Sequence, residues 1–186
     1  MTHKEEGTLK DFNFDTYCGL YCGACSIMMA CRTGRKDALA SFWTEPILRS
    51  SLQSRGIDPP DSESLQLKCH GCKTGTLFVN CRHCKIRSCA IEKKIEHCNE
   101  CNEYPCGFFD ESLLNADIQK MVPHVKNAPD NLEKIRKDGV EQWLNEQKKR
   151  WECPGCGTSY SWYTTSCPQC GKDHLDTWVF QDPRKR

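Results

Sequence analysis

Half of the sixteen cysteines in this 186-residue chain lie between Cys69 and Cys106, in the runs CHGC, CRHCKIRSC and CNECNEYPC. Two thiolates that are two residues apart can bind one tetrahedral metal ion from a tight turn, and a second pair completes the coordination shell. The stretch contains three such pairs, and each of the two remaining cysteines follows a pair by five residues. We therefore expect this part of the chain to fold around bound metal.

The rest of the chain favours metal binding over disulfide bonds as the role of these cysteines. The N-terminal run MTHKEEGTLKDFNF has no apolar core of a signal peptide. A run of about eighteen apolar residues, which a membrane-spanning helix requires, is also absent from the sequence. Paired cysteines in a cytoplasmic chain more often hold metal than form disulfides. We expect a cytoplasmic protein with no membrane segment.

The most specific motif is a repeat near the C-terminus, CPGCG at 153–157 and CPQCG at 167–171. Glycine after the second cysteine of each pair can adopt a left-handed conformation, which turns backbone N–H groups toward the sulfurs. TSYSWYTT between the pairs and LDTWVF after them are rich in residues that favour strands. The repeat predicts a β zinc ribbon of about three short strands, with Zn²⁺ bound by Cys153, Cys156, Cys167 and Cys170.

A third group of cysteines lies in the run YCGLYCGACSIMMACRTG. The spacing of Cys18, Cys22 and Cys25 also occurs in radical enzymes that carry an iron–sulfur cluster, but those need repeated βα units, which this sequence lacks. A simpler cluster such as [4Fe–4S] remains an alternative to zinc at this motif. Cys31 is either the fourth ligand or a free thiol.

The spacing does not determine which cysteines within 69–106 share a metal site. We favour sequential sites, Cys69/Cys72/Cys81/Cys84 and Cys89/Cys98/Cys101/Cys106, over interleaved ones, and His97 is an alternative ligand. All sixteen cysteines are predicted metal ligands: Cys18, Cys22, Cys25, Cys31, Cys69, Cys72, Cys81, Cys84, Cys89, Cys98, Cys101, Cys106, Cys153, Cys156, Cys167 and Cys170.

Short helices are expected between the cysteine groups. The pattern predicts one helix over 24–33 that ends at Gly34, and further helical pieces to residue 55 that are divided near Pro46. We expect a small metal-stabilised α+β fold, with short helices around cysteine-rich knuckles and the C-terminal β zinc ribbon. Three units are predicted: a metal-binding domain at 17–107, a helical segment at 108–150 that packs on it, and the ribbon at 151–180.

Charge is unevenly distributed around the central cysteines. Residues 68–94 carry seven Lys and Arg against one Glu, whereas residues 95–115 carry five acidic residues and no Lys or Arg. The basic half either offsets the negative charge of metal-bound thiolates or forms a patch for phosphate or an acidic partner. The sequence contains no Ser–His–Asp arrangement, phosphate-binding glycine loop or carboxylate pair at a catalytic spacing. These absences favour a non-enzymatic role and leave open whether the protein is an enzyme.

The order of YCGLYCGAC, CHGC, CRHCKIRSCA and CNECNEYPC resembles the prokaryotic cysteine-rich family called domain of unknown function 3795. NLEKIRKDGVEQWLNEQKKRWECPGCG and the second CxxCG are similar to a C-terminal zinc-ribbon extension in longer members. The resemblance implies a metal-binding protein of bacteria or archaea and supplies no activity. In that family the first motif has three cysteines, and Cys31 lies outside it.

Two hypotheses for function follow from these features. The first is a multi-zinc protein that presents a metal-ordered surface to a protein or nucleic acid. The second is a redox protein with an iron–sulfur cluster at Cys18, Cys22 and Cys25.

Overall fold

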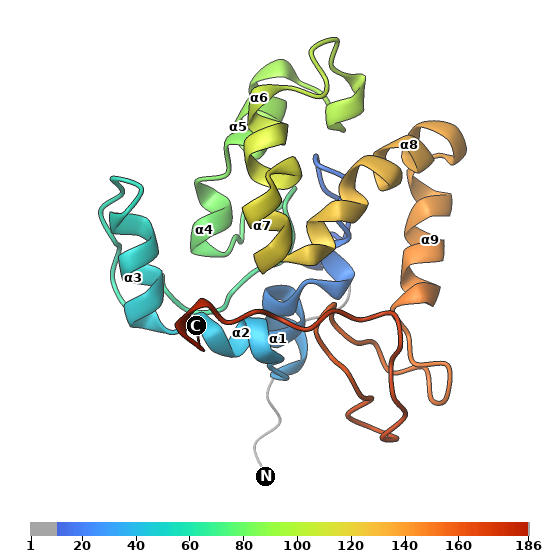
Figure 1. Cartoon of the computed structure of the whole chain (residues 1–186). Coiled ribbons are helices and arrows are strands. Elements are labelled where there is room, and N and C mark those ends of the chain that lie inside the picture. The colour runs from blue at the N-terminus through green and yellow to red at the C-terminus, as the bar shows by residue number, and fades with distance from the viewer. Residues whose placement is uncertain (1–10, 186) are drawn as a thin grey trace.

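The computed structural model describes residues 11–185, and the described part of the chain is built from short helices (Figure 1). The α-helices are α1 (Ser26–Thr33), α2 (Ala38–Phe42), α3 (Glu45–Gln53), α4 (Val79–Arg82), α5 (Lys85–Lys93), α6 (Gly107–Phe109), α7 (Ala116–Met121), α8 (Ala128–Asp138) and α9 (Val140–Arg150). A π-helical turn spans Asp110–Leu114, and 3-10 turns span Cys22–Ala24, Cys98–Glu100, Pro123–Asn127 and Pro183–Lys185.

The first helices follow local signals in the sequence, although α1 begins at Ser26, two residues after the start of the predicted helix 24–33. Gly34 ends α1 in a left-handed conformation with φ of +72°. Asp37 caps α2, since its carboxylate accepts a hydrogen bond from the Ala40 N–H at 2.8 Å. Thr44 precedes α3 and Pro46 lies in its first turn, where a missing N–H costs nothing.

The predicted α+β class and the C-terminal β zinc ribbon are wrong. The part of the chain that the structure describes contains no β-strand, and its C-terminal region has two isolated bridges, Glu152 with Ser159 and Ser166 with Asp173. Each bridge closes a hairpin around one cysteine turn. Between the hairpins, the N–H of Trp162 donates to the Ala24 carbonyl at 3.1 Å and not to the other hairpin. The two hairpins are therefore not joined into a sheet.

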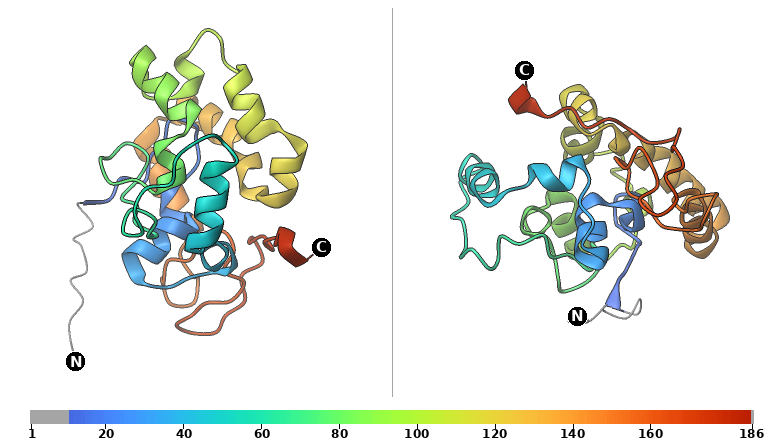
Figure 2. Two further views of the ribbon diagram at one scale, coloured as in Figure 1. Left: turned by 90° about the vertical axis from the view of Figure 1, so that its left-hand side faces the viewer. Right: turned by 90° about the horizontal axis from the view of Figure 1, so that it is seen from below.

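Aromatic side chains fill the largest part of the core. The strand-favouring residues Tyr160, Trp162 and Tyr163 are buried against Trp143 and Trp151, which α9 and the turn after it supply. The chain then returns past α2 on its way to the C-terminus (Figure 1 and Figure 2). The Phe180 and Phe42 rings lie 5.3 Å apart there. High strand propensity at these positions thus reflects aromatic packing.

Two smaller apolar clusters complete the interior. One joins α1, α3 and α4 through Ile27, Leu48, Leu52 and Val79. The other joins α5, the π-turn and α8, and its members are Ile86, Phe109, Leu113, Val125, Ala128 and Leu132. Cysteines contribute to the borders of both clusters. The three predicted domain units stay a prediction. No helix in residues 11–185 is both long enough and apolar enough to span a bilayer.

Candidate metal centres

Two tight turns form the C-terminal cysteine centre. In the first turn, the N–H groups of Cys156 and Gly157 donate to the Cys153 carbonyl at 3.3 and 2.8 Å. In the second, the Gly171 N–H donates to the Cys167 carbonyl at 2.9 Å. Gly157 and Gly171 have φ of +72° and +73°, a conformation that glycine adopts at little cost. The repeated glycines therefore let both cysteine pairs turn toward one point.

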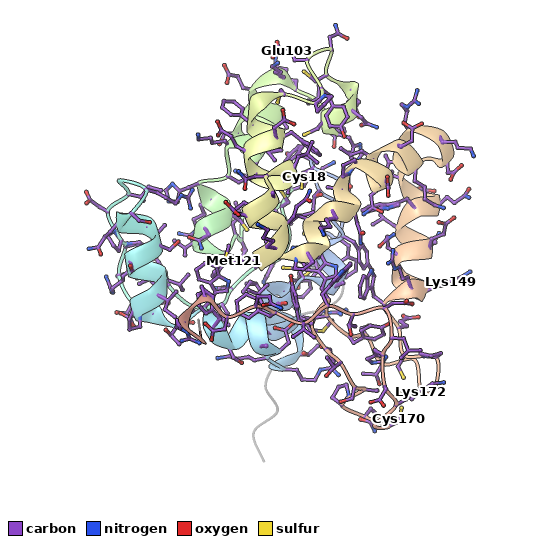
Figure 3. The ribbon with its side chains drawn as sticks, viewed as in Figure 1. Cys18, Glu103, Met121, Lys149, Cys170 and Lys172 are labelled. Carbon is purple, nitrogen blue, oxygen red and sulfur yellow. The ribbon has the colours of Figure 1, made fainter. Side chains whose placement is uncertain are left out.

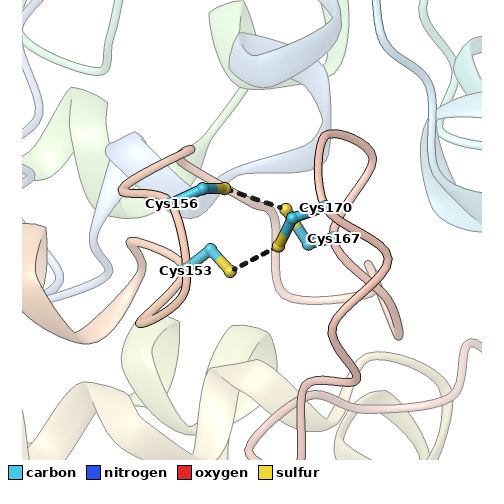
Figure 4. A group of neighbouring side chains, drawn as sticks. All are labelled: Cys153, Cys156, Cys167 and Cys170. Carbon is cyan, nitrogen blue, oxygen red and sulfur yellow. Dashed lines mark hydrogen bonds between the residues drawn. The ribbon is translucent and has the colours of Figure 1, made fainter.

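The four sulfurs of this centre converge (Figure 4). The Sγ atoms of Cys153 and Cys170 lie 3.6 Å apart, those of Cys156 and Cys167 lie 3.5 Å apart, and all four lie within 4.8 Å of one another. Zn–S bonds of ~2.3 Å in a tetrahedron separate sulfurs by roughly 3.8 Å. Among residues 11–185, no other group of three or more metal-type ligand atoms is this close. This group can bind a metal ion.

Local hydrogen bonds favour the thiolate at two of the four cysteines of this centre. Burial raises the pKa of Cys167, but backbone N–H groups of Cys170 and Gln169 outweigh it and lower that pKa to about 6. The hydroxyl and N–H of Thr158 lower the pKa of Cys156. Backbone N–H of Lys172 lowers the pKa of Cys170, yet the neighbouring Cys153 and Cys156 raise it to about 11. Crowded thiolates repel one another, and a divalent cation relieves that repulsion.

A second set of cysteines lies among the helices of the first half of the chain, and we call Cys18, Cys22, Cys25, Cys69, Cys72, Cys81 and Cys84 the central cysteine cluster. Cys69 is buried, Cys81 is exposed and the others are half-buried. Cys18 lies inside the helical region, whereas Cys170 lies at the outer tip of the C-terminal loops (Figure 3). The segment before Cys18 is held between two cysteine loops. The Asn13 N–H donates to the His70 carbonyl at 2.8 Å, and the Cys98 N–H donates to the Tyr17 carbonyl at 2.8 Å.

Mutual electrostatic coupling shows which central cysteines are neighbours. Burial and the nearby Cys25, Cys72 and Cys69 raise the pKa of Cys22, and Cys25, Cys69 and Cys72 act in the same direction on Cys81. Burial raises the pKa of Cys18 to about 11, with Cys84 adding to the effect. The first motif is therefore interleaved with the cysteines of 69–84.

This arrangement separates residues that the sequence analysis grouped together. Burial and then Cys18 and Cys84 raise the pKa of Cys72 to about 12, so Cys18 lies near Cys72 and Cys84. Cys22 lies near Cys25, Cys72 and Cys69, and Cys25 lies near Cys69. A site at Cys18, Cys22 and Cys25 stays a prediction. Cys31 lies in α1 beside an open depression lined by Lys36 and Lys68, and none of these couplings involves it. A ligand role for Cys31 stays a prediction.

The second half of 69–106 is brought together as a sequential group. Cys89, Cys98, Cys101 and Cys106 line one small cavity with α5 and α6. Burial raises the pKa of Cys98 to about 12, and the nearby Cys18, Cys106 and Cys89 act in the same direction. Cys98 therefore lies between the central cysteine cluster and this cavity.

His97 belongs to a buried polar network that sequence reasoning missed. Its Nε2 lies 3.0 Å from Asp15 and its Nδ1 lies 3.3 Å from Glu100, so both ring nitrogens face carboxylates instead of a metal position. Lys73 completes the network, with Nζ at 2.6 Å from Asp15 and 2.9 Å from Glu96. Asp15, Lys73 and His97 are far apart in the chain, and no sequence pattern connects them.

A basic groove lies on the side of α4, α5 and α6. Its volume is about 790 Å³, and we define it by Arg55, Arg82, His83, Lys85 and Phe108, with Glu92 as its acidic lining residue. The Arg55 guanidinium donates to the His83 carbonyl at 2.9 Å and that of Arg82 donates to the Leu77 carbonyl at 3.2 Å. These hydrogen bonds to carbonyls orient the guanidinium groups of Arg55 and Arg82 and do not neutralise their positive charge.

Sequence comparison agrees with the cysteine pattern over the first part of the chain. A family described as "Protein of unknown function (DUF3795)" matches residues 14–111, just over half of the chain. The matched region contains the central cysteine cluster and the cavity of Cys89 and Cys106, and it ends before the C-terminal centre. A zinc-ribbon extension is therefore not covered by this match. No curated protein and no solved structure matches the chain.

Proposed function

The chain belongs to the DUF3795 family of proteins of unknown function, and from that premise we propose that it is a zinc-stabilised module that binds single-stranded nucleic acid in the basic groove. Zinc at the C-terminal centre would hold the two cysteine turns and the aromatic core together. The groove would supply the contacts to phosphate and base.

Convergence of four thiolates is the observation that supports zinc. Four cysteines at tetrahedral spacing are the ligand set of structural zinc sites, which leave no coordination position open for a substrate. Cys153 and Cys167 are buried and Cys156 and Cys170 are exposed, so the ion would lie at the boundary between the aromatic core and solvent. A closed site there stabilises the fold and performs no chemistry itself.

An excess of cationic over acidic side chains is the observation that supports nucleic-acid binding. The groove is lined by Arg55, Arg82 and Lys85 against Glu92, and the exposed Lys85 also pairs with Glu111 at 3.4 Å. Phe108 is 42% exposed and has the Lys85 Nζ 5.7 Å above its ring. Proteins that bind single-stranded nucleic acid use cations to contact the phosphates and exposed aromatic rings on which unpaired bases stack.

Other basic residues of this region have a different role. Lys93 Nζ lies 3.3 Å from the Cys101 sulfur, and the Arg87 guanidinium donates to the Cys72 carbonyl at 2.9 Å. These two cations face the cysteine loops, where they offset thiolate charge. The groove cations face solvent, and that difference favours a polyanionic partner for the groove.

Fluorescence anisotropy of labelled single-stranded RNA and DNA oligonucleotides, measured across a salt series, tests the proposal. We expect binding that weakens with salt, and a loss of about tenfold in affinity for Arg82→Ala with Lys85→Ala, with a salt slope reduced by roughly 0.7 per lost phosphate contact. The matched control is Lys137→Ala with Lys148→Ala, two exposed lysines of α8 and α9. No binding at low salt, an equal loss in the control, or binding of an acidic peptide alone would overturn it.

A further inference from the structure

We propose that a cleft between the end of α1 and the two C-terminal hairpins binds a small sugar phosphate. The cleft has a volume of about 420 Å³, and its lining includes Arg35, Lys36 and Asp37 on one side and Ser159 and Thr165 on the other. This volume is in the range of pockets that bind small molecules. No described residue lines both this cleft and the basic groove, so the inference does not rest on nucleic-acid binding.

Two cations line the cleft without a carboxylate partner. Among residues 11–185, neither Arg35 nor Lys36 forms an ion pair, and the Lys36 side chain is exposed. The Arg35 guanidinium donates to the Ser159 carbonyl at 3.0 Å and to the Thr33 hydroxyl at 3.2 Å. These bonds to neutral groups fix its position and keep its charge. A phosphate between Arg35 and Lys36 would accept charge-assisted hydrogen bonds from both.

A third cation lies beside the cleft. The guanidinium groups of Arg32 and Arg35 contact the same sulfur, that of Met29, at 3.8 and 3.6 Å. The Nε of Arg32 is buried and has no hydrogen-bond partner in the described part of the chain. Two guanidinium groups at one neutral atom repel each other, and a bound anion relieves that repulsion.

Asp37 limits the charge of the ligand without pairing with the cations. One of its oxygens accepts a hydrogen bond from the Ala40 N–H, and the other accepts from the hydroxyls of Ser26 and Ser161. The carboxylate is therefore already held by donors of the protein. Its negative charge still repels long polyanions, so the lining favours one phosphate group over a nucleic-acid backbone.

Hydroxyl groups on the opposite wall suit a ligand that carries hydroxyls itself. Ser159 belongs to the first hairpin, and Thr165 and Ser166 lead into the second. Within residues 11–185, the hydroxyls of these three side chains have no hydrogen-bond partner. Each hydroxyl can both donate and accept, which is how a sugar hydroxyl is recognised.

The tyrosines of the lining argue against a nucleotide. Tyr160 and Tyr163 border the cleft but are only 6% and 5% exposed. The Tyr160 hydroxyl donates to the Arg150 carbonyl at 3.0 Å, and that of Tyr163 lies 2.7 Å from the His124 Nδ1. Neither ring offers the open face on which a base stacks. The non-phosphate part of the ligand should therefore be a sugar.

Isothermal titration calorimetry of the full chain with glucose-6-phosphate tests the inference. We expect saturable binding with a Kd below about 1 mM. Glucose, which lacks the phosphate, should bind at least about tenfold more weakly. Adenosine monophosphate, which has a base, should also bind more weakly. In NMR spectra, glucose-6-phosphate should shift the backbone amide signals of Ser159, Thr165 and Ser166 most.

Substitutions at exposed positions of the lining avoid damage to the fold. Lys36→Met should weaken binding of glucose-6-phosphate about tenfold, and Thr165→Val should weaken it about threefold. The matched control is Lys137→Met, at an exposed lysine of α8, which should leave the affinity unchanged. Lys36→Met should also bind labelled oligonucleotides as the wild type does, which separates this cleft from the basic groove.

Four results would overturn the inference. They are no saturable binding of glucose-6-phosphate, equal affinity for glucose, equal loss in Lys36→Met and Lys137→Met, and tighter binding of adenosine monophosphate than of glucose-6-phosphate. Amide shifts confined to the basic groove would place the phosphate there and would also contradict a site in this cleft. Failure of oligonucleotides to bind has no bearing on these outcomes.

Discussion

The imidazole of His124 lies flat on the indole of Trp162, with ring centroids 3.8 Å apart and planes 12° apart. His124 is in the 3-10 turn Pro123–Asn127 before α8, and Trp162 is in the segment between the C-terminal cysteine pairs. The Nδ1 atom of His124 lies 2.7 Å from the Tyr163 hydroxyl. This contact connects the helical region to the segment that carries the C-terminal centre.

The His124 contact predicts a stability loss in acid. Burial lowers the pKa of His124 from 6.5 to about 3, so below pH 6.5 the unfolded chain binds a proton that the folded chain excludes. The free energy of unfolding should fall as pH drops from 6.5 toward 3. From pH 7 to pH 5, denaturant titration should show about 2 kcal/mol more loss for the wild type than for His124→Phe. Equal losses in the two proteins would contradict a buried neutral imidazole.

Removing metal should loosen the C-terminal loops before the helices. Without an ion, each cysteine turn retains only its short hairpin hydrogen bonds, such as Cys167 N–H to the Lys172 carbonyl at 2.8 Å. Mild chelation should speed tryptic cleavage after Lys172 about tenfold or more, while circular dichroism keeps its helical signal. Lys149, exposed on α9, is the internal control (Figure 3). Equal acceleration after Lys149 would instead indicate global unfolding.

Asp37 should be the most sensitive carboxylate outside the cysteine loops. One of its oxygens caps α2, and the other accepts hydrogen bonds from the Ser26 hydroxyl at 2.6 Å and from the Ser161 hydroxyl. Asp37→Ala should cost about 2–4 kcal/mol of unfolding free energy because it removes a cap and the acceptor of both serine hydroxyls, of which Ser161 keeps only its hydrogen bond to Thr164. Asp117→Ala, at an exposed ion pair on α7, should cost less than about 0.5 kcal/mol. Similar costs for Asp37→Ala and Asp117→Ala would contradict a stabilising role for the hydrogen bonds of Asp37 to Ser26 and Ser161.

Sequence periodicity and cap chemistry predicted the helices well because those signals are local. Gly34, Thr44 and Pro46 each act through their own turn, so the boundaries of α1 and α3 follow from a few neighbouring residues. Strand propensity failed for 158–165, because a strand requires a partner and the backbone of Trp162 bonds to Ala24 instead.

Cysteine spacing predicted which thiols pair in tight turns and left the partners of each pair open. Cys153–Cys156 and Cys167–Cys170 are close in the chain and converge as expected. The first motif instead interleaves with cysteines about fifty residues away, because the Asn13 and Tyr17 backbones hydrogen-bond to the loops at His70 and Cys98. Spacing within a motif contains no information on such a long-range contact.

Gly71 should tolerate no side chain. Its φ is +124°, and a Cβ built there would lie 2.0 Å from the Asn13 carbonyl oxygen, which is backbone and cannot move aside. Gly71→Ala should cost about 3 kcal/mol or more in denaturant unfolding, since it breaks the contact between the first motif and the His70 loop. Gly56→Ala is the control: φ is +70° with nothing within 4 Å, so only the backbone cost of about 1–2 kcal/mol remains. Equal costs would show that the contact contributes nothing.

Lys73 should stabilise the fold through its ion pair with Asp15, which is largely buried, and not as a solvent-exposed ion pair. Burial alone would raise the pKa of Asp15, but hydrogen bonds from His97 and Lys73 outweigh it and hold that pKa below 3.8. The charged carboxylate therefore stabilises the fold at neutral pH, and this contribution disappears as pH falls through the lowered pKa. Lys73→Met leaves a largely buried carboxylate with one cationic neighbour fewer and should cost about 2–4 kcal/mol.

A double-mutant cycle separates this pairing from general packing. Lys73→Met with Asp15→Asn removes both charges, so it should cost less than the sum of the two single changes by at least about 1 kcal/mol in denaturant unfolding at pH 7. Lys120→Met, at an exposed pair with Asp117, should change stability by less than about 1 kcal/mol. Additive costs at Lys73 and Asp15 would mean that the two side chains stabilise the protein independently. The ion pair between them would then not be what connects the first motif to the Cys98 loop.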